Sequence, residues 1–301
     1  MRARSLVRIL LVAAFFALVS VALLLAQTGG PRYALVIGNG AYKGGLPQLK
    51  NPANDASDVA AAFRRLGYKV ELLVDADELT MEAAAARLAD NLGSNASSTG
   101  VFYYAGHGVQ SQGANYLIPV DANIPAEAFL KTKALSAQTV LDLMQQAGNK
   151  LNLVILDACR DNPFSWSRST ASRGLSVVGA QPPGSIVVFA TSAGSTAQDG
   201  TGRNGLFTQE FLKNLESPGL DLNATLDRTA AGVQKESGNR QNPAIYKQFF
   251  GTAYLGVLPS AAASSPPSVV AQRVSIGPDD DYPKELRQSL GEFGERGNPL
   301  P

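Results

Sequence analysis

The chain contains a single cysteine, Cys159, and a single histidine, His107. A thiolate can attack a carbonyl carbon, and a nearby imidazole can both favour the thiolate and donate a proton to the leaving group. One residue of each kind is enough for such a nucleophilic pair. The same counts exclude an internal disulfide and a zinc site built mainly from cysteine and histidine. Taken alone, each residue also has a structural interpretation, as a small buried hydrophobic residue and as a hydrogen-bonded loop histidine.

Both residues follow short apolar runs that are typical of buried strands. Residues 101–104 lead into the string YAGHG around His107, and residues 151–156 lead into DACRDNP around Cys159. In an open parallel sheet, ligands bind outside the carboxyl ends of the strands. If these two strands are neighbours, about 4.8 Å apart, His107 and Cys159 can face each other across one cleft. The backbone N–H groups of Gly108 and Cys159 are then the candidates for an oxyanion hole.

The wider pattern predicts an α/β fold, in which strands alternate with amphipathic helices around a mainly parallel central sheet with helices on both faces. Strands are expected over 33–37, 70–74, 101–104, 151–156 and 185–190, with a last short strand within 244–250. The first helix should end at Gly67, and the second should be capped by Thr80 and run to Leu92. Further helices are expected from apolar residues at helical spacing within 140–147, 207–215 and 222–233.

The two ends of the chain differ in composition from this central part. The N-terminus has three arginines and no acid before a long apolar run, which predicts an export signal or a membrane anchor over 1–30. The sequence leaves cleavage and retention of this segment both open, and either one places the rest of the chain on the periplasmic or extracellular side. A folded domain is expected over 31–256, and the Ala-, Ser- and Pro-rich residues 257–301 are expected to form a flexible tail.

The overall composition limits the classes of partner. With 301 residues, 45% of them hydrophobic, the chain can bury a substantial core. Its formal net charge of +1 and its lack of long basic runs argue against nucleic-acid binding. Partners are therefore expected among proteins and peptides, with the membrane contacted through the N-terminal segment. The sequence carries no pattern that specifies an oligomeric state.

Four strings, RYALVIGNGAY, NPANDA, YYAGHG and LDACRDNP, resemble in their order and spacing the bacterial caspase-like proteins related to metacaspases. The resemblance covers about residues 32–254 and implies a caspase-like three-layer fold with cysteine endopeptidase activity and no required cofactor. It implies His107 and Cys159 as the catalytic dyad, with Gly108 and Cys159 as oxyanion donors. It also implies that Asp55 and Asp157 form a pocket for Arg or Lys before the cut bond, because two carboxylates attract a long cationic side chain.

Some implications of this resemblance have a structural alternative. Asp55 is equally well explained as an acid in the first turn of a helix, where the helix dipole favours it. Asp157 is harder to explain in this way, because a carboxylate at the end of a buried strand needs a partner or a functional reason. Arg168 and Arg173 lie in a segment that, by analogy, is a candidate for self-cleavage, although basic residues in a solvated loop need no special explanation.

Calcium activation stays open. Of two other classes of function, a dinucleotide-binding enzyme and a binding scaffold, only the first is discounted. Asp121 matches one acid of the metacaspase calcium site, but no acidic pair occurs within 131–136. A dinucleotide-binding enzyme is discounted, because the third glycine of G-x-G-x-x-G would fall at Lys43. A caspase-like scaffold that binds signalling partners without cutting them remains the main alternative, since a fold does not guarantee activity.

Overall fold

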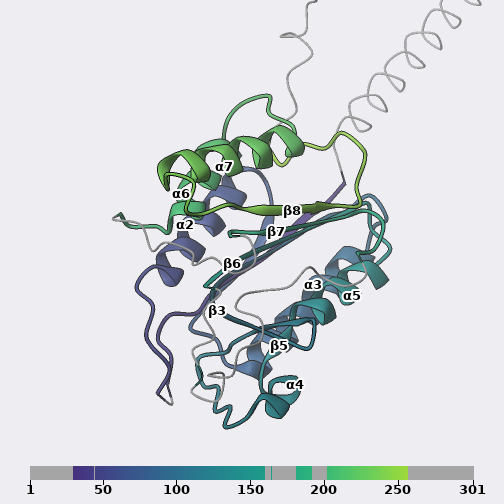
Figure 1. Cartoon of the computed structure of the whole chain (residues 1–301). Helices are drawn as coiled ribbons and strands as arrows, with labels where there is room; N and C mark the ends of the chain where they lie inside the picture. Colours follow the sequence, from purple (N-terminus) through teal and green to yellow (C-terminus); the bar gives the residue numbers. More distant parts are fainter. Residues whose placement is uncertain (1–29, 44, 160–163, 165–180, 192–201, 257–301) are drawn as a thin grey trace, which may run out of the picture. The chain divides into compact units, whose positions relative to one another are not determined.

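The computed structural model of the chain describes residues 30–43, 45–159, 164, 181–191 and 202–256 (Figure 1). Within these ranges one sheet has the strand order β2-β1-β3-β6-β7-β8, with β4 and β5 attached beside β3. All neighbours from β2 to β7 run parallel, and β8 is antiparallel to β7. The strands are β1 (Arg32–Gly38), β2 (Lys69–Val74), β3 (Thr99–Ser111), β4 (Ala114–Leu117), β5 (Leu135–Ser136), β6 (Leu151–Cys159), β7 (Ser185–Phe189) and β8 (Ala244–Lys247).

Helices cover both faces of this sheet (Figure 1). One face packs against α2 (Pro52–Arg65), α6 (Leu206–Leu215) and α7 (Leu222–Glu236), and the other packs against α3 (Glu78–Gly93) and α5 (Ala137–Gln146). A 3-10 turn, η1 (Glu127–Phe129), leads into the short α4 (Leu130–Lys133). The predicted α/β fold with a mainly parallel sheet and helices on both faces is therefore confirmed.

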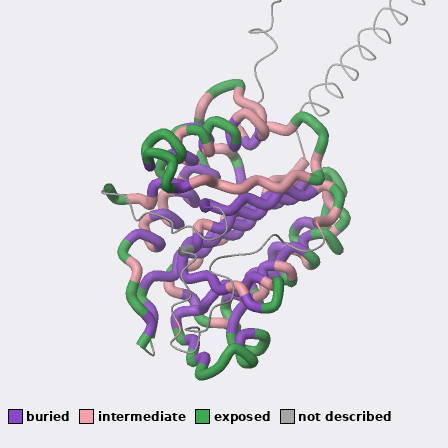
Figure 2. The backbone as a smooth tube through the Cα atoms, viewed as in Figure 1, coloured by how far each residue is buried: buried purple, intermediate pink, exposed green. Residues whose placement is uncertain are grey.

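The central strands are buried over most of their length, as the purple tube in Figure 2 shows. Because side chains alternate between the two faces of a strand, neighbouring residues of β3 enter different cores. Tyr103 packs in the core beneath α2 and α6, and Tyr104 packs in the core beneath α3 and α5. The side chains of the two adjacent tyrosines therefore lie on opposite faces of the sheet.

The structure corrects several predicted boundaries. The helix predicted to begin at Thr80 is α3, which begins at Glu78, and its cap is Asp77, whose side chain accepts the Thr80 N–H at 2.8 Å. Strand β3 does not end at residue 104 but continues to Ser111 and turns into β4. That turn uses two positive φ angles, 49° at Gln112 and 81° at Gly113. Gln is a weak turn signal, so the hairpin was not evident from the sequence.

The predicted leader over 1–30 and the predicted tail over 257–301 lie outside the described residues, apart from Gly30. Within the described ranges, no helix has the length and apolar character needed to cross a membrane. Both assignments therefore stay predictions.

Candidate active site

His107 and Cys159 lie at the end of the parallel pairing between β3 and β6. The register of β3 and β6 pairs Ala105 with Asp157 and His107 with Cys159. The second pair closes the parallel ladder, because β3 continues from Gly108 as a hairpin with β4. The strand adjacency required by the sequence argument is therefore confirmed, and the backbones of the only cysteine and the only histidine are neighbours.

The imidazole of His107 is held in one orientation. The residue is 5% exposed, and its Nε2 atom lies 2.8 Å from the carbonyl oxygen of Pro47. Because a carbonyl oxygen only accepts hydrogen bonds, Nε2 carries the hydrogen and Nδ1 is the basic nitrogen of the neutral ring. The ring also packs against that of Tyr42, with centroids 4.5 Å apart. These contacts favour one tautomer and one ring orientation of His107.

The backbone N–H of Gly108 is directed towards the β6 side of the strand. The carbonyl oxygen of His107 accepts a hydrogen bond from the N–H of Ile118, just after β4. In a trans peptide, the C=O of one residue and the N–H of the next point in opposite directions, and the described residues contain no cis peptide. The Gly108 N–H therefore points away from β4, towards the strand that carries Cys159. This is the side on which the predicted oxyanion role of Gly108 requires its N–H to lie.

Asp55 and Asp157, which we call the acid pair, converge at the start of α6. A β-carbon built on Gly205 would lie 3.4 Å from Asp55 Oδ2 and 3.8 Å from Asp157 Oδ2. Asp55 is in the first turn of α2, as the structural alternative required, but its Oδ1 accepts the N–H of Gly205 at 3.0 Å, across the sheet face. It is 3% exposed. Burial and the facing Asp157 carboxylate raise the pKa of Asp55 to about 7.

Two hydroxyl groups support Asp157, which is partly buried. Thr208 donates from Oγ1 to Asp157 Oδ2 at 2.7 Å, and the Tyr103 hydroxyl lies 3.5 Å from the same oxygen. Burial and the nearby Asp157 carboxylate raise the pKa of Tyr103 well above its usual value, so its phenol stays protonated. Thr208 can therefore stabilise an ionised Asp157 directly, and Tyr103, which donates to Thr208 Oγ1 at 2.5 Å, supports it through Thr208.

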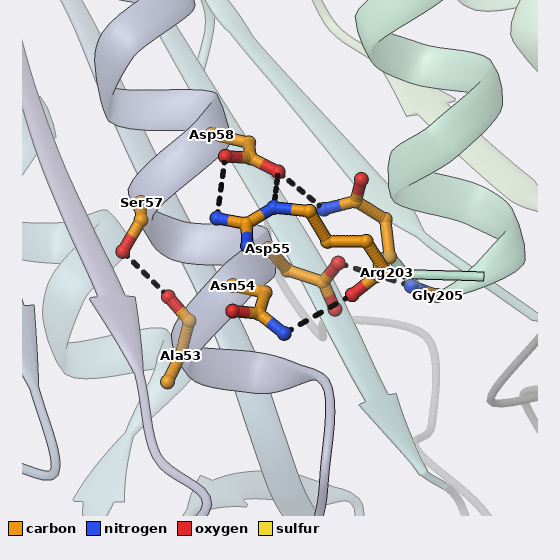
Figure 3. A network of polar contacts seen from close by, with 8 residues as sticks. Ala53, Asn54, Asp55, Ser57, Asp58, Arg203 and Gly205 are labelled. Carbon is orange, nitrogen blue, oxygen red and sulfur yellow. Dashed lines mark hydrogen bonds and ion pairs between the residues drawn. The ribbon is translucent and has the colours of Figure 1, made fainter.

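A polar network on α2 holds the segment that precedes α6 (Figure 3). Arg203 donates to Asp58 twice, from Nε to Oδ2 at 2.9 Å and from Nη2 to Oδ1 at 3.1 Å. Asn204 donates to the same Asp58 at 3.0 Å, and Asn54 donates to the Arg203 carbonyl oxygen at 3.3 Å. The Arg203 side chain is 61% exposed, so solvent screens this ion pair strongly. Together the contacts fix the N-terminus of α6 against the acid pair.

The remaining predicted site residues are not brought into this cluster. Arg168 and Arg173 lie outside the described residues, so self-cleavage there stays a prediction. Asp121, the candidate calcium ligand, is exposed, and among the described residues no three His, Cys, Asp or Glu side chains are grouped as a metal site would need. Sequence reasoning missed Pro47, Thr208 and Gly205, which no motif marks.

Comparison with known proteins finds relatives of one domain family. A family model described as the caspase domain matches residues 31–254. The mucosa-associated lymphoid tissue lymphoma translocation protein 1 homolog of Mus musculus is 32% identical over 218 residues, which cover 69% of this chain and 25% of that protein. The Homo sapiens protein is 31% identical over 209 residues, covering 68% and 24%. The chain thus spans about a quarter of the length of these curated relatives.

A solved structure supports the fold independently. The crystal structure of caspase-1 from Spodoptera frugiperda superposes with a TM-score of 0.56 and 14% sequence identity, covering 76% of this chain and 94% of that chain. At this identity the similarity concerns the fold alone. It confirms the caspase-like three-layer arrangement that the sequence resemblance implied.

Proposed function

This chain belongs to the caspase-domain family, and we propose that it is a cysteine endopeptidase that cuts peptide bonds after arginine or lysine. The observation that carries the proposal is the register of β3 and β6, which pairs His107 with Cys159 and Ala105 with Asp157. The residues proposed as nucleophile, acid/base group and one pocket acid thus lie on two neighbouring strands, where their parallel pairing ends. The proposed substrates are proteins or peptides.

In the proposed reaction, the Cys159 thiolate attacks the carbonyl carbon of the substrate, and the carbonyl π electrons move to oxygen. The N–H groups of Gly108 and Cys159 stabilise the resulting oxyanion. As the tetrahedral intermediate collapses, the C–N bond breaks and the His107 imidazolium gives its proton to the leaving amine. Water then attacks the thioester while His107 takes its proton, which releases the carboxylic acid and regenerates the thiolate. These steps use no cofactor.

The acid pair supports the proposed preference for a basic residue. Two carboxylates that approach one point repel each other, and a bound cation between them removes that repulsion. A guanidinium group is planar and can donate to both carboxylates at once, whereas the ammonium group of lysine is a single compact charge. We therefore expect arginine to be preferred over lysine in this pocket.

The experiment that tests the proposal compares fluorogenic peptides that differ only in the residue before the cut bond. With the full chain in mild detergent, we expect arginine peptides to be hydrolysed fastest, lysine peptides more slowly, and aspartate or asparagine peptides at least about 100-fold more slowly in kcat/KM. Calcium is added in a parallel series, which decides whether it activates. If no peptide turns over with or without calcium, the non-cutting scaffold becomes the better account.

The pH dependence of the pocket should be visible in kcat/KM. Because burial and the Asp157 carboxylate raise the pKa of Asp55 to about 7, Asp55 gains a proton as the pH falls below that value. The pocket then loses one negative charge, so kcat/KM for an arginine peptide should fall below about pH 7. In the complex the bound cation favours the ionised form, so kcat should persist to lower pH.

The Asp55→Asn variant is the control for this assignment. It cannot titrate at that position, so its kcat/KM should be lower and should lose the limb near pH 7, leaving the titration of the dyad. If kcat/KM of the variant falls at the same pH and from the same value as in the wild type, the titration belongs to His107 and Cys159 instead of Asp55.

A further inference from the structure

Two tyrosine hydroxyl groups hold the backbone of His107 on both sides. The Tyr42 hydroxyl oxygen accepts the His107 N–H at 2.7 Å. The Tyr104 hydroxyl donates to the His107 carbonyl oxygen at 2.8 Å. The two hydroxyl oxygens lie 3.2 Å apart, and both residues are buried. Residues 62 positions apart in the sequence thus meet around one histidine.

Donors and acceptors can be assigned for the hydrogen bonds of this cluster. The Tyr42 oxygen uses a lone pair for the His107 N–H, so its own hydrogen is available to the Ile118 carbonyl oxygen, 3.3 Å away, or to the Tyr104 oxygen. The Tyr104 hydrogen is shared between the carbonyl oxygens of His107 and Ile118, the second at 3.0 Å. The Ile118 N–H completes the arrangement by donating to the His107 carbonyl oxygen at 3.0 Å. The main chain of His107 is therefore held by three donors or acceptors.

Gly106 is the residue that lets the two hydroxyl groups approach. A β-carbon at this position would lie 2.6 Å from the Tyr42 oxygen and 2.6 Å from the Tyr104 oxygen, closer than such atoms come in real proteins. A larger residue would push both tyrosines away from His107. The tyrosine hydroxyl groups thus explain sterically why a glycine precedes the histidine in YYAGHG, independently of any need for substrate access.

We infer that Tyr42 and Tyr104 are positioning residues, which fix the imidazole of His107 through its backbone and, for Tyr42, through direct ring contact. The inference rests on the proposed function, because it assigns His107 the acid/base role. The adjacent Tyr103 has a different task, since its hydroxyl lies on the other face of β3, beside Thr208 and Asp157. Of the two adjacent tyrosines in the motif, Tyr104 therefore contacts the proposed acid/base residue, and Tyr103 contacts the proposed pocket.

The test replaces each tyrosine by phenylalanine, which keeps the ring and removes the hydroxyl. In Tyr42→Phe and Tyr104→Phe we expect kcat, per active site titrated with a covalent arginine-based inhibitor, to fall about 10-fold, because small misplacements of a catalytic group are costly. KM for the arginine peptide should stay within about twofold, since neither hydroxyl faces the acid pair. Tyr68→Phe is the matched control: Tyr68 is buried, and its hydroxyl has no hydrogen-bond partner among the described residues. It should leave both constants unchanged.

A second readout does not depend on turnover. Because His107 is the only histidine of the chain, the imidazole ¹⁵N and ¹³C signals of tag-free protein report on it alone. We expect the wild type to show the Nε2–H tautomer, and the two tyrosine variants to shift the His107 pKa or tautomer ratio while Tyr68→Phe does not. Wild-type turnover with unchanged kcat and unchanged histidine signals in both variants would overturn the inference alone. Absence of wild-type turnover with shifted signals would overturn the proposed function but keep the structural coupling.

Discussion

Replacing Cys159 by alanine is expected to abolish hydrolysis of arginine peptides, lowering kcat/KM by at least about 10⁴-fold. No other thiol in the chain can take its place. His107→Ala should cost nearly as much, and the double variant should be little worse than either single one, because groups that act as a unit do not contribute additively. The measurement is kcat/KM on the arginine peptide for the three variants.

Alkylation by iodoacetamide separates the two roles within the dyad. Since Cys159 is the only cysteine, every labelled molecule is labelled there. In His107→Ala the thiol loses its imidazole partner, so its alkylation near pH 7 should slow and follow an ordinary thiol pKa of about 8.5. Unfolding temperatures of the variants, compared with the wild type, control for damage to the fold. Retained hydrolysis in folded Cys159→Ala would contradict the dyad outright.

The parts of the fold that the sequence predicted well are those with a long periodic pattern. Strands β1 and β2, helix α2 and the glycine that ends it at a φ of 84° all lie where apolar spacing and Gly67 indicated. Strands β4 and β5 were missed because four and two residues are too few to carry a period. The cap of α3 was misplaced from Asp77 to Thr80 because both are good capping residues three positions apart, and only geometry decides between them.

The candidate site divides in the same way. The adjacency of His107 and Cys159 could be predicted, because each residue is unique in the chain and follows an apolar run, and the two strands pair. The contacts of Pro47 and Thr208 with His107 and Asp157 join residues 60 and 51 positions apart, which no local pattern encodes. Tyr42 had a weak signal, since it closes the string RYALVIGNGAY, but its role depends on tertiary packing.

Asp157→Asn should remove most of the preference for arginine while leaving the protein folded. The variant keeps the shape of the side chain but loses a charge that a buried guanidinium would contact, so kcat/KM for the arginine peptide should fall about 100-fold or more. Lysine peptides should lose less if arginine alone contacts both carboxylates. Thr208→Val, which keeps the volume and removes the hydroxyl that donates to Asp157, should cost about 10-fold. Kinetics on paired arginine and lysine peptides measure all three effects.

The sign of the stability change distinguishes a pocket acid from a structural one. Burial and the facing Asp157 carboxylate raise the pKa of Asp55 from its ordinary 3.8 to about 7, so the folded state binds more protons than the unfolded state between these values. Stability must then fall as the pH rises through this range, and the mutual repulsion of the acid pair is largest above it. Neutralising either acid should therefore keep or raise the unfolding temperature at pH 8, even as arginine cleavage is lost. If Asp157 instead served mainly as the partner of Thr208 and Tyr103, Asp157→Asn would lower the unfolding temperature at pH 8 while changing peptide selectivity little. Two carboxylates that destabilise the free protein, and whose repulsion is removed when a cationic side chain binds between them, have the property expected of a substrate pocket.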